Sequence, residues 1–208
     1  MPTKPTRRIL VLGIGNLLWA DEGFGVRCVE VMNEIWRFPA QVTVMDGGTQ
    51  GLYLLPYVQE ADCLLVFDAV DYGDVPGTLR EVTGDAVPRF MGAKKMSLHQ
   101  TGFQEVLAAA ELTGQLPRER VLIGVQPAEL EDFGGSLREV VKEQLPAALD
   151  LGLAWLERWG AKPEAREGRS DRINDGALAM DVYEAERPPA EVAYRLGDAR
   201  FLNLAEQA

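Results

Sequence analysis

The sequence predicts a single α/β enzyme domain with three layers, α/β/α, built on a mostly parallel sheet. Short, continuously apolar segments that end at a glycine or an acid alternate with segments whose apolar residues recur at helical spacing. This alternation favours parallel strands that are covered on both faces by helices. The chain has 208 residues, 47% of them hydrophobic, which is enough to bury a core of this kind.

Five segments are expected to form strands. The first and third are short apolar runs, as is typical of strands buried on both faces of a sheet, and the fourth has the character of an outer strand. They are Arg8–Leu12, Gln41–Met45, Cys63–Phe67, Thr78–Val82 and Arg120–Val125.

Helices are expected between these strands. Asp21 is expected to cap a helix that begins near Glu22, because a carboxylate can accept hydrogen bonds from the free N–H groups of a first turn. A short helix is expected around residues 52–58. Two longer helices are expected over Gly102–Thr113 and Leu137–Trp159, the second bent or interrupted at Pro146.

The apolar periodicity is lost after Gly160. We therefore assign residues 1–160 to the domain and predict that residues 161–208 form a C-terminal tail, either disordered or packed on the surface. On this interpretation, a chain that ends at Gly160 should unfold at nearly the same temperature as the full chain.

Composition excludes several classes of protein. A formal net charge of −11 argues against a nucleic-acid partner. Two isolated cysteines do not form a disulfide framework, which fits a reducing compartment. No segment reaches the roughly 18 apolar residues of a membrane span. The basic start is followed by an apolar run that Gly13, Gly15 and Asn16 interrupt, so it does not predict a signal peptide. We expect a soluble, cytoplasmic protein.

Three acids follow expected strands or their turns: Glu22, Asp46 and Asp68. Ligands of open α/β sheets bind outside the carboxyl ends of the strands. Taken singly, each acid is better explained as a cap or turn residue, and Asp46 in the sequence DGGT keeps part of that explanation. Asp68 directly follows five apolar residues, where an idle carboxylate would be costly to bury.

His99 is the only histidine of the chain. A lone histidine is usually structural or exposed, but this one lies in a polar loop just before an expected helix. Its side chain could share the sheet edge with Glu22 and Asp68. Two carboxylates and one imidazole suit a divalent ion and leave coordination positions open. The three residues come from separate loops, so their spacing alone carries little weight.

Other catalytic motifs are incomplete or missing. The sequence Gly13-x-Gly15 resembles a dinucleotide fingerprint, but Leu18 stands where the third glycine belongs. The hypothesis of a nucleotide-binding reductase rests on this turn alone. We expect no organic cofactor. There is no GxSxG, HExxH or GxxxxGK[ST] sequence. Cys28 and Cys63 fall within an expected helix and strand, as packing residues do.

Five motifs in order resemble the hydrogenase maturation proteases: GIGNLLWADEGFGV, DGGT, DAVDYGDVPGT, SLHQTG and GVQPAELEDFGGSL. The resemblance covers about residues 8–159. It implies a twisted five-stranded sheet, with Glu22, Asp68 and His99 as the metal-binding and catalytic residues. It also implies an endopeptidase, classed as aspartic-type, that removes a C-terminal peptide from the large-subunit precursor of a nickel-iron hydrogenase. The tail resembles that of longer members, which implies an uptake hydrogenase.

The same resemblance implies that nickel is contributed by the substrate, since the family acts only after nickel insertion. The expected partner is therefore the precursor. We expect neither a nucleic-acid nor a membrane partner, and we favour a monomer. The metal or one carboxylate would activate water, and the sequence leaves that choice open. A D-[ST]-G signature of pepsin-like enzymes is absent. The alternative is a non-catalytic, nickel-sensing chaperone of the same precursor.

Overall fold

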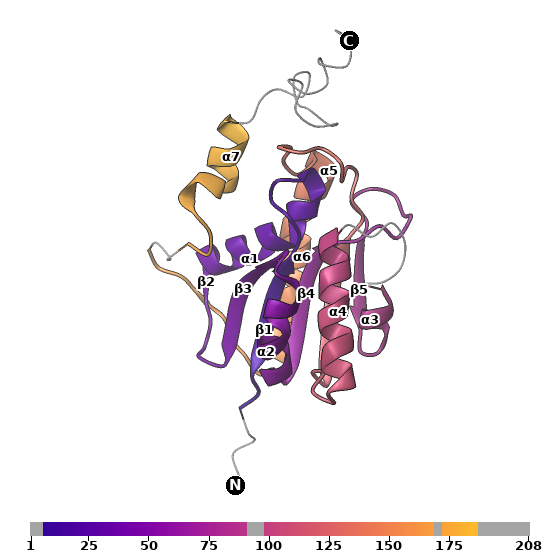
Figure 1. Cartoon of the computed structure of the whole chain (residues 1–208). Coiled ribbons are helices and arrows are strands. Elements are labelled where there is room, and N and C mark those ends of the chain that lie inside the picture. Colours follow the sequence, from indigo (N-terminus) through magenta and orange to yellow (C-terminus); the bar gives the residue numbers. More distant parts are fainter. Residues whose placement is uncertain (1–5, 91–97, 169–171, 187–208) are drawn as a thin grey trace, which may run out of the picture.

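A five-stranded sheet forms the centre of the molecule (Figure 1). The computed structural model describes residues 6–90, 98–168 and 172–186. The strand order is β3-β1-β4-β6-β5, and all neighbours are parallel except the edge strand β5, which is antiparallel to β6. The strands are β1 (Ile9–Ile14), β3 (Val42–Gly48), β4 (Cys63–Ala69), β5 (Leu79–Thr83) and β6 (Glu119–Val125). The predicted mostly parallel sheet is therefore confirmed.

Alternate residues of each strand enter two separate cores, one on each face of the sheet. On one face, Val11, Leu65 and Ile123 pack with α1 (Phe24–Ile35) and α6 (Leu145–Arg158). On the other, Leu12, Val66 and Leu122 pack with the helices α2 (Leu55–Glu60), α3 (Ala86–Phe90) and α4 (Leu98–Leu112). Helices thus cover both faces, which confirms the three-layer prediction (Figure 1).

Short elements complete the described chain. The 3-10 helices are η1 (Ala20–Gly23), η2 (Gly51–Leu54) and η3 (Gly176–Leu178), and the short helices are α5 (Glu139–Lys142) and α7 (Met180–Glu186). A second, two-stranded sheet pairs β2 (Trp36–Arg37) with β7 (Glu164–Ala165). The longest described helix, α4, has 15 residues. Since a bilayer needs about 20, no helix in the described ranges can span a membrane.

Several element boundaries differ from the predictions. The region Leu137–Trp159 contains two helices, α5 and α6, and Pro146 lies in the first turn of α6, where proline is well tolerated. Helix α4 begins at Leu98, so His99 lies in its first turn and not in a loop before it. The strands β3 and β4 continue far enough to include Asp46 and Asp68.

The described part of the C-terminal tail packs against the domain. Ala161 is fully buried, and β7 pairs with the strand that follows α1. Arg27 of α1 is only 2% exposed, and its guanidinium donates to the carbonyl oxygen of Leu178 at 2.6 Å and to Glu30 at 2.7 Å. The ring of Tyr183 lies against the same guanidinium. Residues 172–186 therefore supply partners to a buried charge of the domain.

These contacts reverse our expectation for truncation. A chain that ends at Gly160 loses the acceptor at Leu178 and leaves Arg27 under-satisfied. This should cost about 2–3 kcal/mol, which corresponds to a fall in Tm of roughly 4–12 °C for a domain of this size. A chain that ends at Glu186 keeps every one of these contacts and is the matched control. Equal melting temperatures for the chain ending at Gly160 and the full chain in calorimetry would contradict this prediction.

Candidate active site at the carboxyl edge of the sheet

Glu22 lies on η1, in the segment that connects the carboxyl end of β1 to α1, and is 7% exposed. Its backbone is fixed by two hydrogen bonds: its N–H donates to Trp19 at 2.9 Å, and its carbonyl accepts from Asn16 at 3.2 Å. Gly15 has φ of 137°, and a Cβ there would lie 1.8 Å from the Glu22 carbonyl oxygen. Only glycine allows this turn. The turn therefore sets the position of Glu22.

The start of α1 lies unusually close to the sheet. A Cβ on Gly25 would lie 2.1 Å from the carbonyl oxygen of Phe67 and 2.3 Å from that of Ile14, and a Cβ on Gly13 would meet the Gly25 carbonyl at 2.3 Å. The close backbone packing of β1, β4 and α1 therefore requires glycine at positions 13 and 25. This packing places Glu22 beside the end of β4, and η1 contacts that strand.

Asp68 lies near the carboxyl end of β4 and has no exposed surface. Its position alternates with Phe67, which enters the core against α1 and α6. Asp68 therefore belongs to the face of the sheet that α4 covers, together with Leu64 and Val66. Two of the predicted site residues, Glu22 and Asp68, thus lie buried at one edge of the sheet.

The helix that carries His99 also begins at this edge. A Cβ on Gly102, one turn further along α4, would lie 3.4 Å from the Cα of Gly51, where η2 begins just after β3. Helix α4 therefore starts at the edge where β3 ends. The side chain of His99 lies outside the described residues. Among the side chains that are described, no three histidine, cysteine or acidic groups gather as a metal site. The proposed three-ligand set therefore depends on His99.

Asp46 belongs to a different part of the surface. It lies within β3 and is partly buried, and burial raises the pKa of its carboxyl, while the amide of Asn174 opposes this. Asn174 also donates to Glu30 at 2.9 Å. Asp46 is thus associated with α1 and the C-terminal segment.

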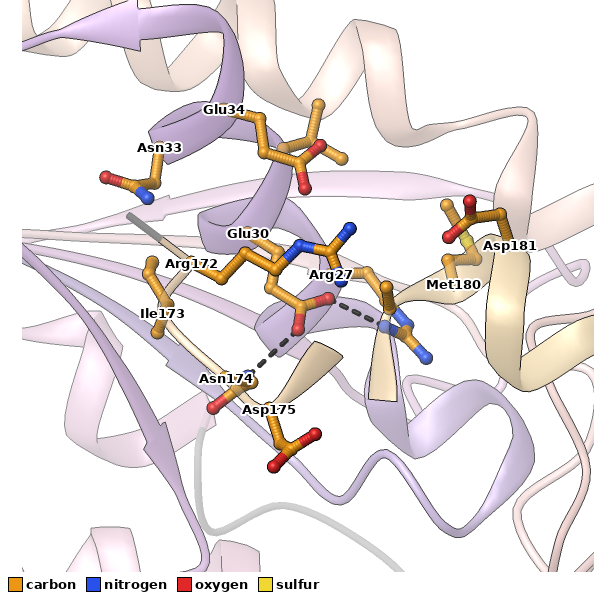
Figure 2. Close-up of a pocket in the computed structure, with 12 residues that line it drawn as sticks. Arg27, Glu30, Asn33, Glu34, Arg172, Ile173, Asn174, Asp175, Met180 and Asp181 are labelled. Carbon is orange, nitrogen blue, oxygen red and sulfur yellow. Dashed lines mark hydrogen bonds and ion pairs between the residues drawn. The ribbon is translucent and has the colours of Figure 1, made fainter. Parts of the chain in front are cut away.

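A polar hollow of about 320 Å³ lies between α1 and residues 172–181 (Figure 2). Figure 2 shows Arg27, Glu30 and Asn174 joined across it by an ion pair and a hydrogen bond. Its lining does not include Glu22 or Asp68. This hollow is therefore separate from the candidate site at the sheet edge.

The predicted helix cap at Asp21 is wrong. Asp21 is fully buried, and its carboxylate accepts the backbone N–H groups of Ala128 and Glu129, both at 2.8 Å, and of Arg138 at 2.7 Å. Burial raises the pKa of this carboxyl, and the three N–H groups oppose the rise. Asp21 therefore fixes residues 126–138, a long loop beside Glu22. Sequence spacing could not reveal it, because its partners lie more than 100 residues away.

We expect Asp21→Asn to be clearly destabilising. An amide presents one acceptor and one donor, so at least one of the three backbone N–H groups loses its acceptor. The cost should be about 2 kcal/mol or more, a fall in Tm of roughly 4–8 °C. Asp150→Asn, on an exposed position of α6, is the matched control and should leave Tm unchanged. Unaltered melting of the Asp21 variant would refute this role of the carboxylate.

Gln126 was also missed by the sequence analysis. It is 5% exposed, and its Oε1 accepts the backbone N–H groups of Tyr72 at 2.8 Å and Asp74 at 3.2 Å. Its Nε2 donates to Asp71 at 3.0 Å. One side chain thus orders the loop that follows Asp68. The only signal in the sequence was a loop rich in Gly, Asp and Pro, which needs an outside partner for its backbone.

Both cysteines are buried, as expected of packing residues. Burial raises the pKa of the Cys63 thiol to about 11 and that of Cys28 well above its usual value. Since the thiolate is the nucleophile, neither cysteine is prepared for catalysis at neutral pH.

The chain thus has an α/β fold with two buried acids at a candidate site on the sheet edge. A family model for "Hydrogenase maturation protease" matches residues 26–155. The hydrogenase expression/formation protein HupM of Azotobacter chroococcum mcd 1 is 64% identical over 200 residues, or 96% of each chain. The chain therefore belongs to the hydrogenase maturation protease family, and it is an endopeptidase of hydrogenase maturation.

The E. coli relatives are shorter. The hydrogenase 2 maturation protease of E. coli K12 is 39% identical over 165 residues, which cover 79% of this chain and 99% of that protein. The solved structure of the hydrogenase maturating endopeptidase HybD from E. coli superimposes with a TM-score of 0.72 at 38% identity, covering 76% of this chain and 98% of that one. The two proteins therefore share the α/β fold.

Proposed function

We propose that this enzyme removes the C-terminal peptide from the nickel-loaded large-subunit precursor of a nickel-iron hydrogenase. The observation that carries the proposal is the burial of Glu22 and Asp68 at one sheet edge, where the helix of His99 also begins. Family membership supplies the reaction class, a proteolytic step of hydrogenase maturation.

The chemistry follows from the donor set. Carboxylate oxygens and an imidazole bind a divalent ion and leave positions for ligands that the precursor already provides. Glu22, Asp68 and His99 would hold the precursor's nickel and thereby fix the adjacent peptide bond, which makes the reaction effectively unimolecular. The nickel or one carboxylate would activate the attacking water. Nickel is thus part of the substrate, and no resident metal or organic cofactor is needed.

We propose that the enzyme acts in the cytoplasm as a monomer. Its partner is proposed to be an uptake hydrogenase. Two buried free thiols suit a reducing compartment. The relative from A. chroococcum matches 96% of this chain, whereas the E. coli protein matches 79%. The tail therefore groups this protein with the longer relatives, and the assignment to uptake hydrogenases rests on that resemblance.

The direct test is to incubate the purified enzyme with nickel-loaded precursor and to measure the mass of any released peptide. One peptide that matches the precursor's C-terminus is the expected result. A mature large subunit, already processed, is the control and should release nothing. Stable binding of the precursor without any released peptide would favour the nickel-sensing chaperone.

A further inference from the structure

Three strands bring Asp68, Gly124 and Arg80 into one row across the sheet. Asp68 of β4 is the register partner of Gly124 in β6, and Gly124 is the partner of Arg80 in β5. Alternation places all three on the face that α4 covers, because Val66, Leu122 and Val82 enter the core of that face. The missing side chain at Gly124 leaves a space between the carboxylate of Asp68 and the guanidinium of Arg80.

Tyr72 fills this space. A Cβ on Gly124 would lie 2.2 Å from the Tyr72 hydroxyl oxygen and 3.0 Å from the ring carbon that carries it. The guanidinium of Arg80 lies over the same ring, 5.1 Å from its centre, and is itself held by Asp74. The Tyr72 backbone is fixed by Gln126. Three separate contacts thus hold the phenol over Gly124.

The Tyr72 hydroxyl is buried and close to the Asp68 charge. Its oxygen has almost no solvent-accessible surface, although part of the residue is exposed. Asp68 lies on the neighbouring strand as the register partner of Gly124, over which the hydroxyl lies. A phenol keeps its proton at neutral pH, because its ordinary pKa is about 10, so it can donate a hydrogen bond to a neighbouring carboxylate.

We propose that Tyr72 is a positioning residue for Asp68: once the substrate is bound, the Tyr72 hydroxyl donates to the Asp68 carboxylate and holds it in the orientation that receives the substrate's nickel. This inference rests on the proposed function. Groups that orient a metal ligand commonly affect activity about 10- to 100-fold when they are removed. A phenol is suited to the task because its ring is rigid and its hydroxyl reaches across the unoccupied position of Gly124.

The first test is Tyr72→Phe, assayed with nickel-loaded precursor. We expect kcat to fall about 10- to 100-fold, with KM and Tm close to those of the wild type, because ring packing is kept. Tyr53→Phe, at a tyrosine that is 83% exposed, is the matched control and should not change kcat. Equal kcat for wild type and Tyr72→Phe would overturn the inference alone. A wild-type chain that leaves the loaded precursor uncut would overturn the proposed function, and this inference with it.

A second pair of variants separates positioning from simple packing. Gly124→Ala places a methyl group against the hydroxyl, so it should lower both Tm and kcat. In the double variant, Gly124→Ala with Tyr72→Phe, the closest contact is removed and Tm should recover in part. We expect kcat to stay low, because the hydroxyl is absent. Recovery of kcat together with Tm would show that the hydroxyl serves packing only and would overturn the proposal.

Discussion

Asp68→Asn is expected to abolish processing of the nickel-loaded precursor while the protein remains folded. The amide is nearly isosteric with the carboxylate but carries no charge, so it binds a cation poorly and cannot act as a base. Loss of such a group typically lowers the rate about 100- to 10,000-fold. Because Asp68 has no exposed surface, deletion of its charge should leave Tm unchanged or raise it.

The measurements are kcat by peptide release and Tm by calorimetry on the same samples. Asp150→Asn, the exposed aspartate of α6, makes the same chemical change away from the sheet edge and should process at the wild-type rate. Full activity of Asp68→Asn would remove Asp68 from the site. A large fall in its Tm would show that the carboxylate mainly serves the fold.

A precursor that lacks nickel is expected to remain uncut, even in the presence of excess enzyme. Two carboxylates and one imidazole bind a free divalent ion more loosely than the four-coordinate cysteine and histidine sites of structural zinc. The enzyme should therefore purify with little metal. Affinity for the loaded precursor would come jointly from the nickel and from the surrounding protein surface, as in any two-point attachment.

Two controls locate the metal. Adding nickel to the enzyme and then stripping the excess should not rescue cleavage of the nickel-free precursor. His99→Ala should weaken binding of the loaded precursor but hardly change any weak binding of the unloaded one. If the purified enzyme instead carries one tight zinc ion per chain and trims nickel-free precursor at full rate, it is an ordinary metalloprotease and the proposed mechanism is wrong.

The C-terminal segment is expected to serve the stability of the fold. The match to the E. coli maturation protease covers 99% of that protein but only 79% of this chain. The described residues 172–186 contact Arg27 and, through Glu184, the side chains of Ser136 and Lys142. These contacts reach the end of the 126–138 loop that Asp21 fixes. We therefore expect the segment to stabilise this version of the domain and not to supply catalytic groups.

The sequence by itself determined the layers of the fold and the candidate acids. Unbroken apolar segments identify strands buried on both faces, and their alternation with helical segments requires a parallel sheet between two layers of helices. A carboxylate directly after such a strand, as at Asp68, indicates a site because an idle charge is costly there. These signals are local, since each depends on residues within a few positions of one another.

Only the tertiary structure decided which groups surround those acids. Asp21 was expected to cap the adjacent helix, yet its partners are backbone groups 107–117 residues away. The tail was expected to be either disordered or packed on the surface, and only the structure shows that its described part supplies an acceptor to the buried Arg27. Tyr72 lies over Gly124, the register partner of Asp68, only because β4, β6 and β5 align in register and Gly124 carries no side chain. The physical reason is common to all three: hydrogen bonds and close packing join residues that are distant along the chain, and a linear pattern does not record such neighbours.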